Sequence, residues 1–435
     1  MATASTPTPG PQPPHVIIIG AGISGLVLAQ CLRKQGVSFE IFERDESPTA
    51  RGGGYCLGLH DAERLFADAL PSDVPPLSST CHLLPLDLPS QLIVYLPHGK
   101  TLKVEDTERT PCTRVNRLKL REMLATNLKI HWGRKAVQVW EDEDKGKGYV
   151  RFEDGGVVEG GSGVLGVGGV ADDNAVRPHV PLMPGCSSVK LRQFPAAVVA
   201  GNVVLEGEEM RRQMRNGYSA YMAVGRGWGL FVGLNRILEI EEKEKGSGEV
   251  KGVKGEYYWL MSEYDEGVAD ENHWTRAMTD EEKLARAKDK VKELREEFRV
   301  VVEKTDVEGV KSSAWSMWYD ATGIEGINVT RVVLIGDAAH PMTPARGEGA
   351  VVAIRDAVQL SKVLSTIDTT DPAAFKKTMQ DFQKEVLTKG SEAVQAASEA
   401  FKGVFQNKTP MAWGWEMEPI QEVPPLPPLK LKAAR

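Results

Sequence analysis

The pattern of apolar and polar positions near the N-terminus predicts a strand, a helix and a second strand in close succession. A β-branched run from Val16 to Ile19 ends at a cluster of glycines, and apolar residues then recur at helical spacing as far as Leu32. A second apolar run follows Gly36 and ends at Phe42. The order and lengths of these segments are typical of a βαβ unit.

The middle of the chain, roughly residues 178 to 330, alternates apolar and polar positions as strands do. Three segments are expected to be strands, at residues 196–207, 227–241 and 255–266. The charged, glycine-rich stretch 242–255 between the last two is expected to be a solvated hairpin loop. Aromatic residues of this region are expected mainly to pack the sheet: Trp228, Phe231, Tyr257, Tyr258, Trp259, Trp315 and Trp318.

Residues 280–304 are predicted to form one amphipathic helix with a single buried face. That face would consist of Leu284, Ala287, Val291, Leu294, Phe298 and Val301. The chain then returns to a strand at 331–336 and a helix that starts near Gly347 and runs to about Leu364. The tail from Val423 onward, rich in proline, is expected to be extended and exposed.

This order of elements predicts an α/β fold in which a dinucleotide-type domain is divided by a β-rich insert. The predicted divisions are a disordered tail at 1–14, a first part of the cofactor domain at 15–177, a β-rich substrate domain at 178–330 interleaved with 55–110, a second part of the cofactor domain at 331–400, and a C-terminal helix and extended tail at 401–435.

Composition narrows the class of protein. The 435 residues are 41% hydrophobic and 26% charged with a net charge of −7, which argues against a nucleic-acid partner because such proteins usually present a basic face. No apolar run approaches the roughly 18 residues of a transmembrane segment. The Pro/Thr/Ser-rich start does not resemble a signal peptide. Five cysteines without metal-ligand spacing indicate reduced thiols, and hence a cytoplasmic protein without a metal site.

The sequence GAGISG after the first strand fits the G-x-G-x-x-G pattern at Gly20, Gly22 and Gly25. In that pattern the glycines permit a tight turn, close approach to a pyrophosphate, and close packing of helix on strand. The following helix would offer free N–H groups to phosphates. Glu43, at the end of the second strand, would accept hydrogen bonds from ribose hydroxyls. Ser24 and Arg44 complete this part of the predicted cofactor site.

A second motif lies far along the chain, in GDAAHPMTPARGEGA at residues 336–350. Asp337 follows a strand directly and could bind a ribityl hydroxyl. The helix beyond the loop would direct its positive end at negative charge on a reduced flavin. The loop and helix start contribute further predicted cofactor-binding residues: Pro344, Gly347, Gly349 and Ala350.

Together these motifs resemble those of the single-component (class A) FAD-dependent monooxygenases, the para-hydroxybenzoate hydroxylase-like family. VNRLKLREML resembles the family's R-x-x-L helix, which assigns Arg117 to FAD, and RGGGY resembles its R-x-x-G segment, with Arg51 and Gly54. The resemblance covers about residues 15–400. Amine oxidases share the first βαβ unit, but there the glycines precede the arginine, whereas here Arg51 comes first.

The resemblance implies a Rossmann-like FAD-binding domain of the glutathione reductase type, an inserted β-sheet substrate domain and a C-terminal helical region. It also implies the chemistry: NAD(P)H reduces the FAD, oxygen gives a C4a-(hydro)peroxyflavin, and a small organic substrate, of the kind found in secondary metabolism, is hydroxylated, epoxidised or oxidised in a Baeyer–Villiger reaction. The substrate would lie over the flavin, against the β-rich insert. No catalytic side chain is assigned, and His340 is expected to shape its loop.

One family motif is altered. The segment GVGGVADDNAVR, residues 166–177, could be a glycine-rich linker, but it resembles the family's V-G-A-D-G-x-x-S-x-V-R strand and turn. Aligned without gaps, Val170 replaces the aspartate, Ala171 a glycine and Asn174 a serine; a gapped alignment would use Asp172 instead. Val351 also replaces a common asparagine. These departures motivate an alternative hypothesis, an FAD-binding isomerase, cyclase or oxidase with impaired NAD(P)H use.

Overall fold

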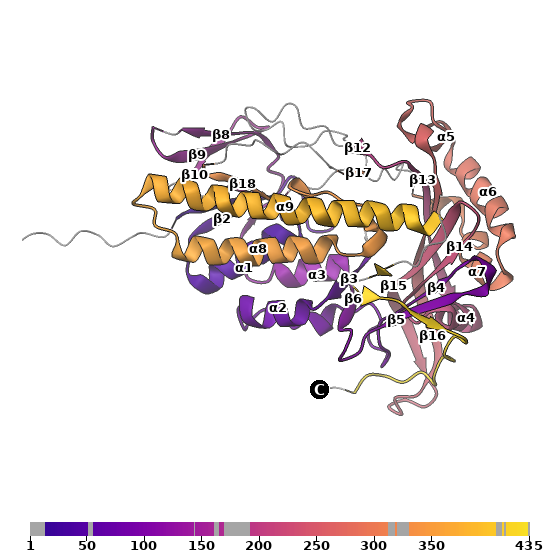
Figure 1. Cartoon of the computed structure of the whole chain (residues 1–435). Coiled ribbons are helices and arrows are strands. Elements are labelled where there is room, and N and C mark those ends of the chain that lie inside the picture. Colours follow the sequence, from indigo (N-terminus) through magenta and orange to yellow (C-terminus); the bar gives the residue numbers. More distant parts are fainter. Residues whose placement is uncertain are drawn as a thin grey trace, which may run out of the picture.

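The computed structural model describes residues 14–50, 55–142, 144–160, 165–168, 192–311, 318–319, 330–405, 411–412 and 415–433. Figure 1 shows a domain of long helices around a small sheet, beside a large, steeply inclined sheet whose far side carries further helices. None of the helices in these ranges is long and apolar enough to cross a membrane.

The first domain is built on a five-stranded parallel sheet in the order β18-β11-β1-β2-β7. Its strands are β1 (Val16–Ile19), β2 (Phe39–Phe42), β7 (Ile130–His131), β11 (Leu165–Gly168) and β18 (Val332–Ile335). Helix α1 (Ile23–Gln35) connects β1 to β2, so the predicted βαβ unit is confirmed. The strand predicted at 331–336 is confirmed as β18.

The two faces of this sheet are covered by different elements. Ile18 of β1 faces α1, since a Cβ added at Gly25 would lie 3.2 Å from the Ile18 side chain. Ile17 points to the opposite face, where a Cβ added at Gly160 would lie 3.2 Å from the Ile17 side chain. Helix α8 (Gly349–Thr366) packs beside α1, and α9 (Pro372–Phe405) packs on α8. The opposite face carries a three-stranded sheet of β8 (Ala136–Asp142), β9 (Lys147–Phe152) and β10 (Val157–Gly160).

The described part of the altered motif is an inner strand of the sheet. β11 lies between β1 and β18, with Val167 opposite Ile19 on one side and Leu334 on the other. The linker reading of these four residues is therefore wrong. A parallel pair on both sides fixes the backbone there whatever the glycine content. The rest of the motif, including Val170, Asp172 and Asn174, lies outside the described residues.

The second sheet has seven strands in the order β13-β16-β15-β14-β4-β5-β21. All three predicted strands are confirmed: β13 (Ala196–Glu206), β15 (Trp228–Glu242) and β16 (Val250–Tyr264). The predicted hairpin loop is shorter than expected, because residues from Val250 onward already pair with β15. The remaining strands are β4 (Gln91–Tyr95), β5 (Thr101–Glu105), β14 (Ala220–Val224) and β21 (Glu418–Ile420).

The outer face of the large sheet packs against α4 (Gly207–Asn216), α6 (Asp280–Lys290) and α7 (Glu296–Glu303). Tyr257 and Trp259 are fully buried in this core. The prediction of one helix over 280–304 is wrong, because Leu294 and Arg295 adopt extended backbone between α6 and α7. The Arg299 side chain donates to the carbonyl of Leu294 at 2.7 Å. In a continuous helix this carbonyl would instead accept a hydrogen bond from a backbone N–H.

The break leaves the predicted apolar face facing the sheet. Leu284, Ala287, Val291, Phe298 and Val301 are buried and Leu294 is half-buried. The periodicity therefore predicted the buried face but not the interruption, which depends on a long side chain reaching back to a carbonyl.

Smaller elements connect the two domains. β3 (Cys56–His60) pairs with β6 (Cys112–Asn116), which leads into α3 (Arg117–Leu124); α2 (Ala62–Ala69) follows β3. Two short pairs join β12 (Arg192–Gln193) to β17 (Trp318–Tyr319) and β19 (Met411–Ala412) to β20 (Trp415–Glu416). The remaining helical pieces are α5 (Trp274–Ala277), η1 (Leu77–Thr80), η2 (Pro97–Gly99), η4 (Glu266–Ala269), η5 (Val291–Glu293), η6 (Val307–Gly309), η7 (Gly336–Ala338) and η8 (Pro344–Arg346).

The C-terminal tail is extended as predicted, but the expectation that it is exposed is wrong in part. Leu429 is 3% exposed and belongs to the core of the large sheet. Its carbonyl accepts from the Val250 amide at 3.0 Å, and the Leu431 amide donates to Gly248 at 2.8 Å. Backbone pairing with the β15–β16 hairpin therefore holds a segment that composition alone marks as solvated.

Candidate active site

The turn after β1 depends on glycine at two of its three predicted positions. Gly20 has a φ of +100°, which side-chain-bearing residues rarely adopt. A Cβ at Gly25 would lie 2.1 Å from the Gly20 carbonyl oxygen, so helix and strand can pack only without it. At Gly22 a Cβ would meet nothing within 4 Å. Gly22 thus borders open space at the start of α1, where a ligand could approach the backbone.

The amino end of α1 is suited to an anion. Gly22 caps the helix without a side chain, and within the described residues the first turn contains no acidic group. The free N–H groups and the positive end of the helix dipole are consequently available to phosphate oxygens. Ser24 is buried in this turn.

Glu43 is tied to this turn from the neighbouring strand. Its Oε2 accepts from the Ala21 amide at 2.7 Å and its Oε1 accepts from the Asp45 amide at 2.9 Å. The residue is 6% exposed. The carboxylate therefore shapes the turn itself. Oε1 can accept a second hydrogen bond, so the predicted hydrogen bond to ribose stays open as a prediction.

Arg121 is a functional candidate that the sequence analysis missed. It is buried, its Nε donates to the Ala21 carbonyl at 2.9 Å, and its guanidinium lies 3.3 Å from both Glu43 and Asp45. It ties α3 to the glycine turn. Its position four residues after Arg117, on the same side of a helix, was the available signal.

The second motif is brought against the first. Gly336 has a φ of +57°, and a Cβ added there would lie 2.8 Å from Ser24 Oγ. The loop after β18 thus touches the turn after β1, although about 300 residues separate them in sequence. Ligands of open α/β sheets bind at the carboxyl ends of strands where the strand order reverses. β1 is such a strand, since β2 lies on one side of it and β11 on the other.

Asp337 combines two properties in this loop. Its side chain is exposed to solvent, yet burial raises the pKa of its carboxyl, opposed by the positive charges of His340 and Arg117. The carboxylate is therefore accessible to solvent although protein atoms surround it closely enough to disfavour its charge. The half-buried Arg117 is close enough to Asp337 to act on that pKa, and it also lies 5.9 Å from the Tyr55 ring.

A buried pair, His340 of this loop and Asp356 of α8, holds the loop against the helix. His340 Nε2 lies 2.6 Å from Asp356 Oδ2, and that oxygen also accepts from the Gly336 amide at 3.0 Å. His340 is 2% exposed, and a Cβ at Gly390 of α9 would lie 2.6 Å from its ring. Burial alone would lower the pKa of His340, but the hydrogen bond and charge of Asp356 outweigh it and raise the pKa. The predicted loop-shaping role fits these contacts.

The remaining predicted residues of the loop surround the start of α8. Pro344 opens η8, and Gly347 has a φ of +65°. The helix begins at Gly349, two residues later than predicted, because the η8 turn and the Gly347 conformation come first. Ala350 is half-buried at its first turn, and Val351 is fully buried in the core.

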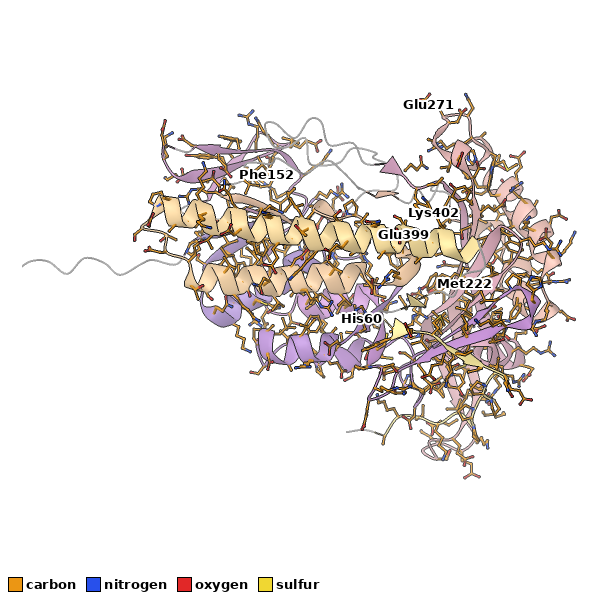
Figure 2. The ribbon with its side chains drawn as sticks, viewed as in Figure 1. His60, Phe152, Met222, Glu271, Glu399 and Lys402 are labelled. Carbon is orange, nitrogen blue, oxygen red and sulfur yellow. The ribbon has the colours of Figure 1, made fainter. Side chains whose placement is uncertain are left out.

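His60 was also missed. It ends β3, is 7% exposed, and its Nδ1 has no hydrogen-bond partner within the described residues. Burial lowers its pKa, with Arg355 of α8 acting in the same direction. Figure 2 places it at the junction of the helical domain and the sheet. Of the predicted site residues, Arg44 is half-buried, and Arg51 and Gly54 lie outside the described residues.

The large sheet presents an apolar row to the first domain. Met222, Phe231 and Leu260 are direct partners across three neighbouring strands, and all three are half-buried. Their strand neighbours on the opposite face are buried under the outer helices. Ala345 of η8 and Leu260 pack against the same small cluster, which contains Ala196 and Val198, so the second motif lies near this row. Figure 2 shows Met222 between the helices and the sheet.

Comparison with known proteins settles the family. The chain is 36% identical over 420 residues to the FAD-dependent monooxygenase thnD of Trichoderma harzianum, covering 94% of this chain and 98% of the relative. The chain belongs to the FAD-dependent monooxygenases. A second relative, the FAD-dependent monooxygenase phnB of Penicillium herquei, is 27% identical over 88% of this chain and 90% of its own. The resemblance recognised in the motifs is therefore confirmed.

Family models and solved structures agree with this membership. Residues 246–382 match an FAD binding domain and residues 18–57 an NAD(P)-binding Rossmann-like domain. A putative FAD-containing monooxygenase from Photorhabdus luminescens has the same fold, with a TM-score of 0.68 at 20% identity over 91% of this chain and 99% of that one. So has 2,6-dihydroxypyridine-3-hydroxylase from Arthrobacter nicotinovorans, with a TM-score of 0.65 at 17% identity over 92% and 95%. The protein is a flavin-dependent oxidoreductase.

Replacing the turn glycines separates folding from cofactor binding in this monooxygenase. Gly25→Ala should destabilise the FAD-free protein by about 2 kcal/mol, because the clash with Gly20 outweighs the roughly 1 kcal/mol by which alanine favours a helix. Gly22→Ala should leave the FAD-free melting temperature nearly unchanged but weaken FAD binding. Thermal unfolding of the FAD-free proteins and FAD titration measure the two effects, and equal melting temperatures for the two variants would contradict this account.

The His340–Asp356 pair should make stability depend on pH. The pKa of His340 is raised in the fold, so its stabilisation is complete below its ordinary value of 6.5 and is lost as the pH rises through the raised value. His340→Gln should cost about 3 kcal/mol at pH 6 and flatten this part of the profile. Denaturant unfolding from pH 6 to 9 measures it. His98→Asn, at an exposed position with a φ of +70° that asparagine tolerates, is the control.

Proposed function

We propose that the enzyme uses NAD(P)H and O2 to place one oxygen atom in a small aromatic substrate of secondary metabolism. For hydroxylation the balance is substrate–H + O2 + NAD(P)H + H⁺ giving substrate–OH + H2O + NAD(P)⁺. The observation that carries the proposal is the contact of Gly336 with Ser24, which brings two predicted cofactor motifs together at the carboxyl ends of strands β1 and β18. Family membership supports the reaction class.

The residues at this edge fit FAD. The open backbone at Gly22 and the free amino end of α1 would hold the pyrophosphate, since both favour an anion. Glu43 would accept a hydrogen bond from the ribose, and the solvent-accessible carboxylate of Asp337 would accept one from the ribityl chain. Arg117 would reach the cofactor from α3. Arg44, Arg51 and Gly54 would border the adenosine side, and Pro344, Gly347, Gly349 and Ala350 the flavin ring.

Bound FAD would supply hydride acceptance from NAD(P)H and activation of oxygen, which no protein side chain provides. The protein's part is to orient and to stabilise charge. The amino end of α8, opened by Gly349, would favour negative charge on the reduced ring. The buried His340–Asp356 pair would keep the preceding loop in one conformation as that charge develops.

The apolar row marks where the substrate would lie. Met222, Phe231 and Leu260 present a continuous half-buried surface beside η8. Binding of a flat apolar molecule on such a surface is stabilised by about 25 cal/mol for each Å² of apolar area removed from water. Its extent across three strands spaced about 4.8 Å apart suits a fused-ring substrate.

Asp337→Asn should weaken FAD binding about ten- to hundredfold. The neutral amide loses a charge-assisted hydrogen bond to a ribityl hydroxyl, worth about 1.5 to 3 kcal/mol. FAD titration followed by flavin fluorescence measures the change. Asp381→Asn is the matched control, since Asp381 is an exposed carboxylate of α9 paired with Lys377. If both variants bind FAD as the wild type does, Asp337 does not contact the cofactor.

Anaerobic NADPH should bleach the flavin absorbance of the purified enzyme near 450 nm (roughly, for oxidised flavins). Rapid mixing in an absorbance spectrometer follows the change with and without an aromatic substrate. A yellow protein that NADPH and NADH leave oxidised would overturn the NAD(P)H-dependent reaction. It would favour instead the isomerase, cyclase or oxidase hypothesis motivated by Val170.

A further inference from the structure

A C-terminal hairpin joins the second cofactor motif to the sheet. Strand β19 contacts η8, which contains Pro344 and Ala345, and β20 pairs back on β19 with Ala412 opposite Trp415. The Trp415 side chain packs against the buried cluster that includes Val224 and Met417, and Met222 and Phe231 of the apolar row pack against the same cluster. In Figure 1 the short yellow strands of this hairpin are drawn between the helical domain and the large sheet.

The chain after Trp415 is anchored firmly. Met417 is 5% exposed and belongs to the same cluster as Met222 and Phe231. β21 then completes the large sheet by pairing with β5, and Glu418 forms an ion pair with Arg109. These contacts fix the chain that follows Trp415 on the large sheet, next to the cluster that Trp415, Met222 and Phe231 share.

The indole of Trp415 has an unsatisfied donor. Its Nε1 is buried and, within the residues that the structure describes, has no hydrogen-bond partner. Buried indole N–H groups normally find an acceptor, because a lost hydrogen bond costs about 1 to 3 kcal/mol. Trp228 and Trp259, the two tryptophans fully buried on the other face of the sheet, follow the rule: their Nε1 atoms donate to Glu293 at 3.0 Å and Thr305 at 2.8 Å.

We propose that Trp415 is a specificity-determining residue that borders the substrate site and donates its indole N–H to an oxygen of the bound aromatic substrate. The inference rests on the proposed function, because it takes the apolar row as the substrate surface. The ring of Trp415 would extend that surface, and its N–H would select molecules that place a hydroxyl or carbonyl oxygen at one end of the ring system.

Two probes separate the ring contact from the hydrogen bond: 1-naphthol, which has an oxygen acceptor, and naphthalene, which has none. Binding to the FAD-loaded enzyme is read from the change in the flavin visible spectrum, without NADPH. Wild type should bind 1-naphthol more tightly than naphthalene. Trp415→Phe should weaken 1-naphthol about five- to tenfold and naphthalene by less than twofold, because only the donor is lost.

Further variants keep the test independent of folding. Trp415→His retains a ring N–H and should restore part of the preference for 1-naphthol, whereas Trp415→Ala should weaken both probes. Trp140→Phe is the control, since Trp140 stacks on Tyr149 in the three-stranded sheet of the other domain. Flavin content and melting temperature of each variant show that the FAD site is intact.

Each outcome decides the proposal. Equal loss of both probes in Trp415→Phe, or no loss of either, would reduce Trp415 to a packing residue and overturn it. Failure of wild type to bind either probe would exclude an aromatic occupant and overturn it as well. Failure of the proposed function is visible separately, as a flavin that NADPH does not reduce in an enzyme whose probe binding is intact.

Discussion

The close approach of Gly336 to Ser24 is the constraint on which the rest of the site depends. Only a residue without a Cβ, at a φ of +57°, lets the loop after β18 touch the turn after β1. The separation of these strands is set by β11, which pairs with both. The cofactor site is therefore defined by a parallel three-strand unit whose members come from the beginning, the middle and the last third of the chain.

That constraint carries an electrostatic cost that the fold offsets locally. The loop surrounds the accessible carboxylate of Asp337 with protein atoms, and this partial desolvation disfavours its charge and raises its pKa. His340 and Arg117 supply the nearest positive charge, and Asp356 in turn holds His340 and the Gly336 amide. Asp356 of α8 thus acts through His340 on Asp337, which lies at the predicted cofactor site. Gly390 lets α9 close over His340, so the long C-terminal helix excludes water from this pair.

The sequence predicted the parts of this arrangement that follow from local geometry. Glycines at fixed spacing, an acidic residue at a strand end and two-residue or helical periodicity each depend on a few neighbouring positions. They identified the βαβ unit, β18, α8 and the two motifs. The spacing of Arg121 from Arg117 places both on one side of a helix, but the burial of Arg121 against Ala21 and of His60 near α8 involves residues distant in sequence and does not follow from local spacing.

The same distinction explains the errors. The break between α6 and α7 depends on where Arg299 reaches, and the anchoring of the tail depends on free backbone groups of the β15–β16 hairpin. Neither appears in a hydrophobic pattern. Trp415 belongs to this class too: the sequence shows an aromatic residue near the C-terminus, whereas the fold packs it on the same cluster of the large sheet as Met222 and Phe231.

The altered motif shows how far fold and chemistry can separate within one strand. The backbone of β11 keeps the pairing that the site requires, with Val167 between Ile19 and Leu334. Pairing of this kind uses only main-chain groups, so it tolerates any side chain that fits the sheet. The aspartate replaced by Val170 would act on a ligand instead of on the sheet. The pairing of β11 is therefore independent of whether Val170 or, in a gapped alignment, Asp172 stands in the aspartate's place, and the sheet itself does not require that charge.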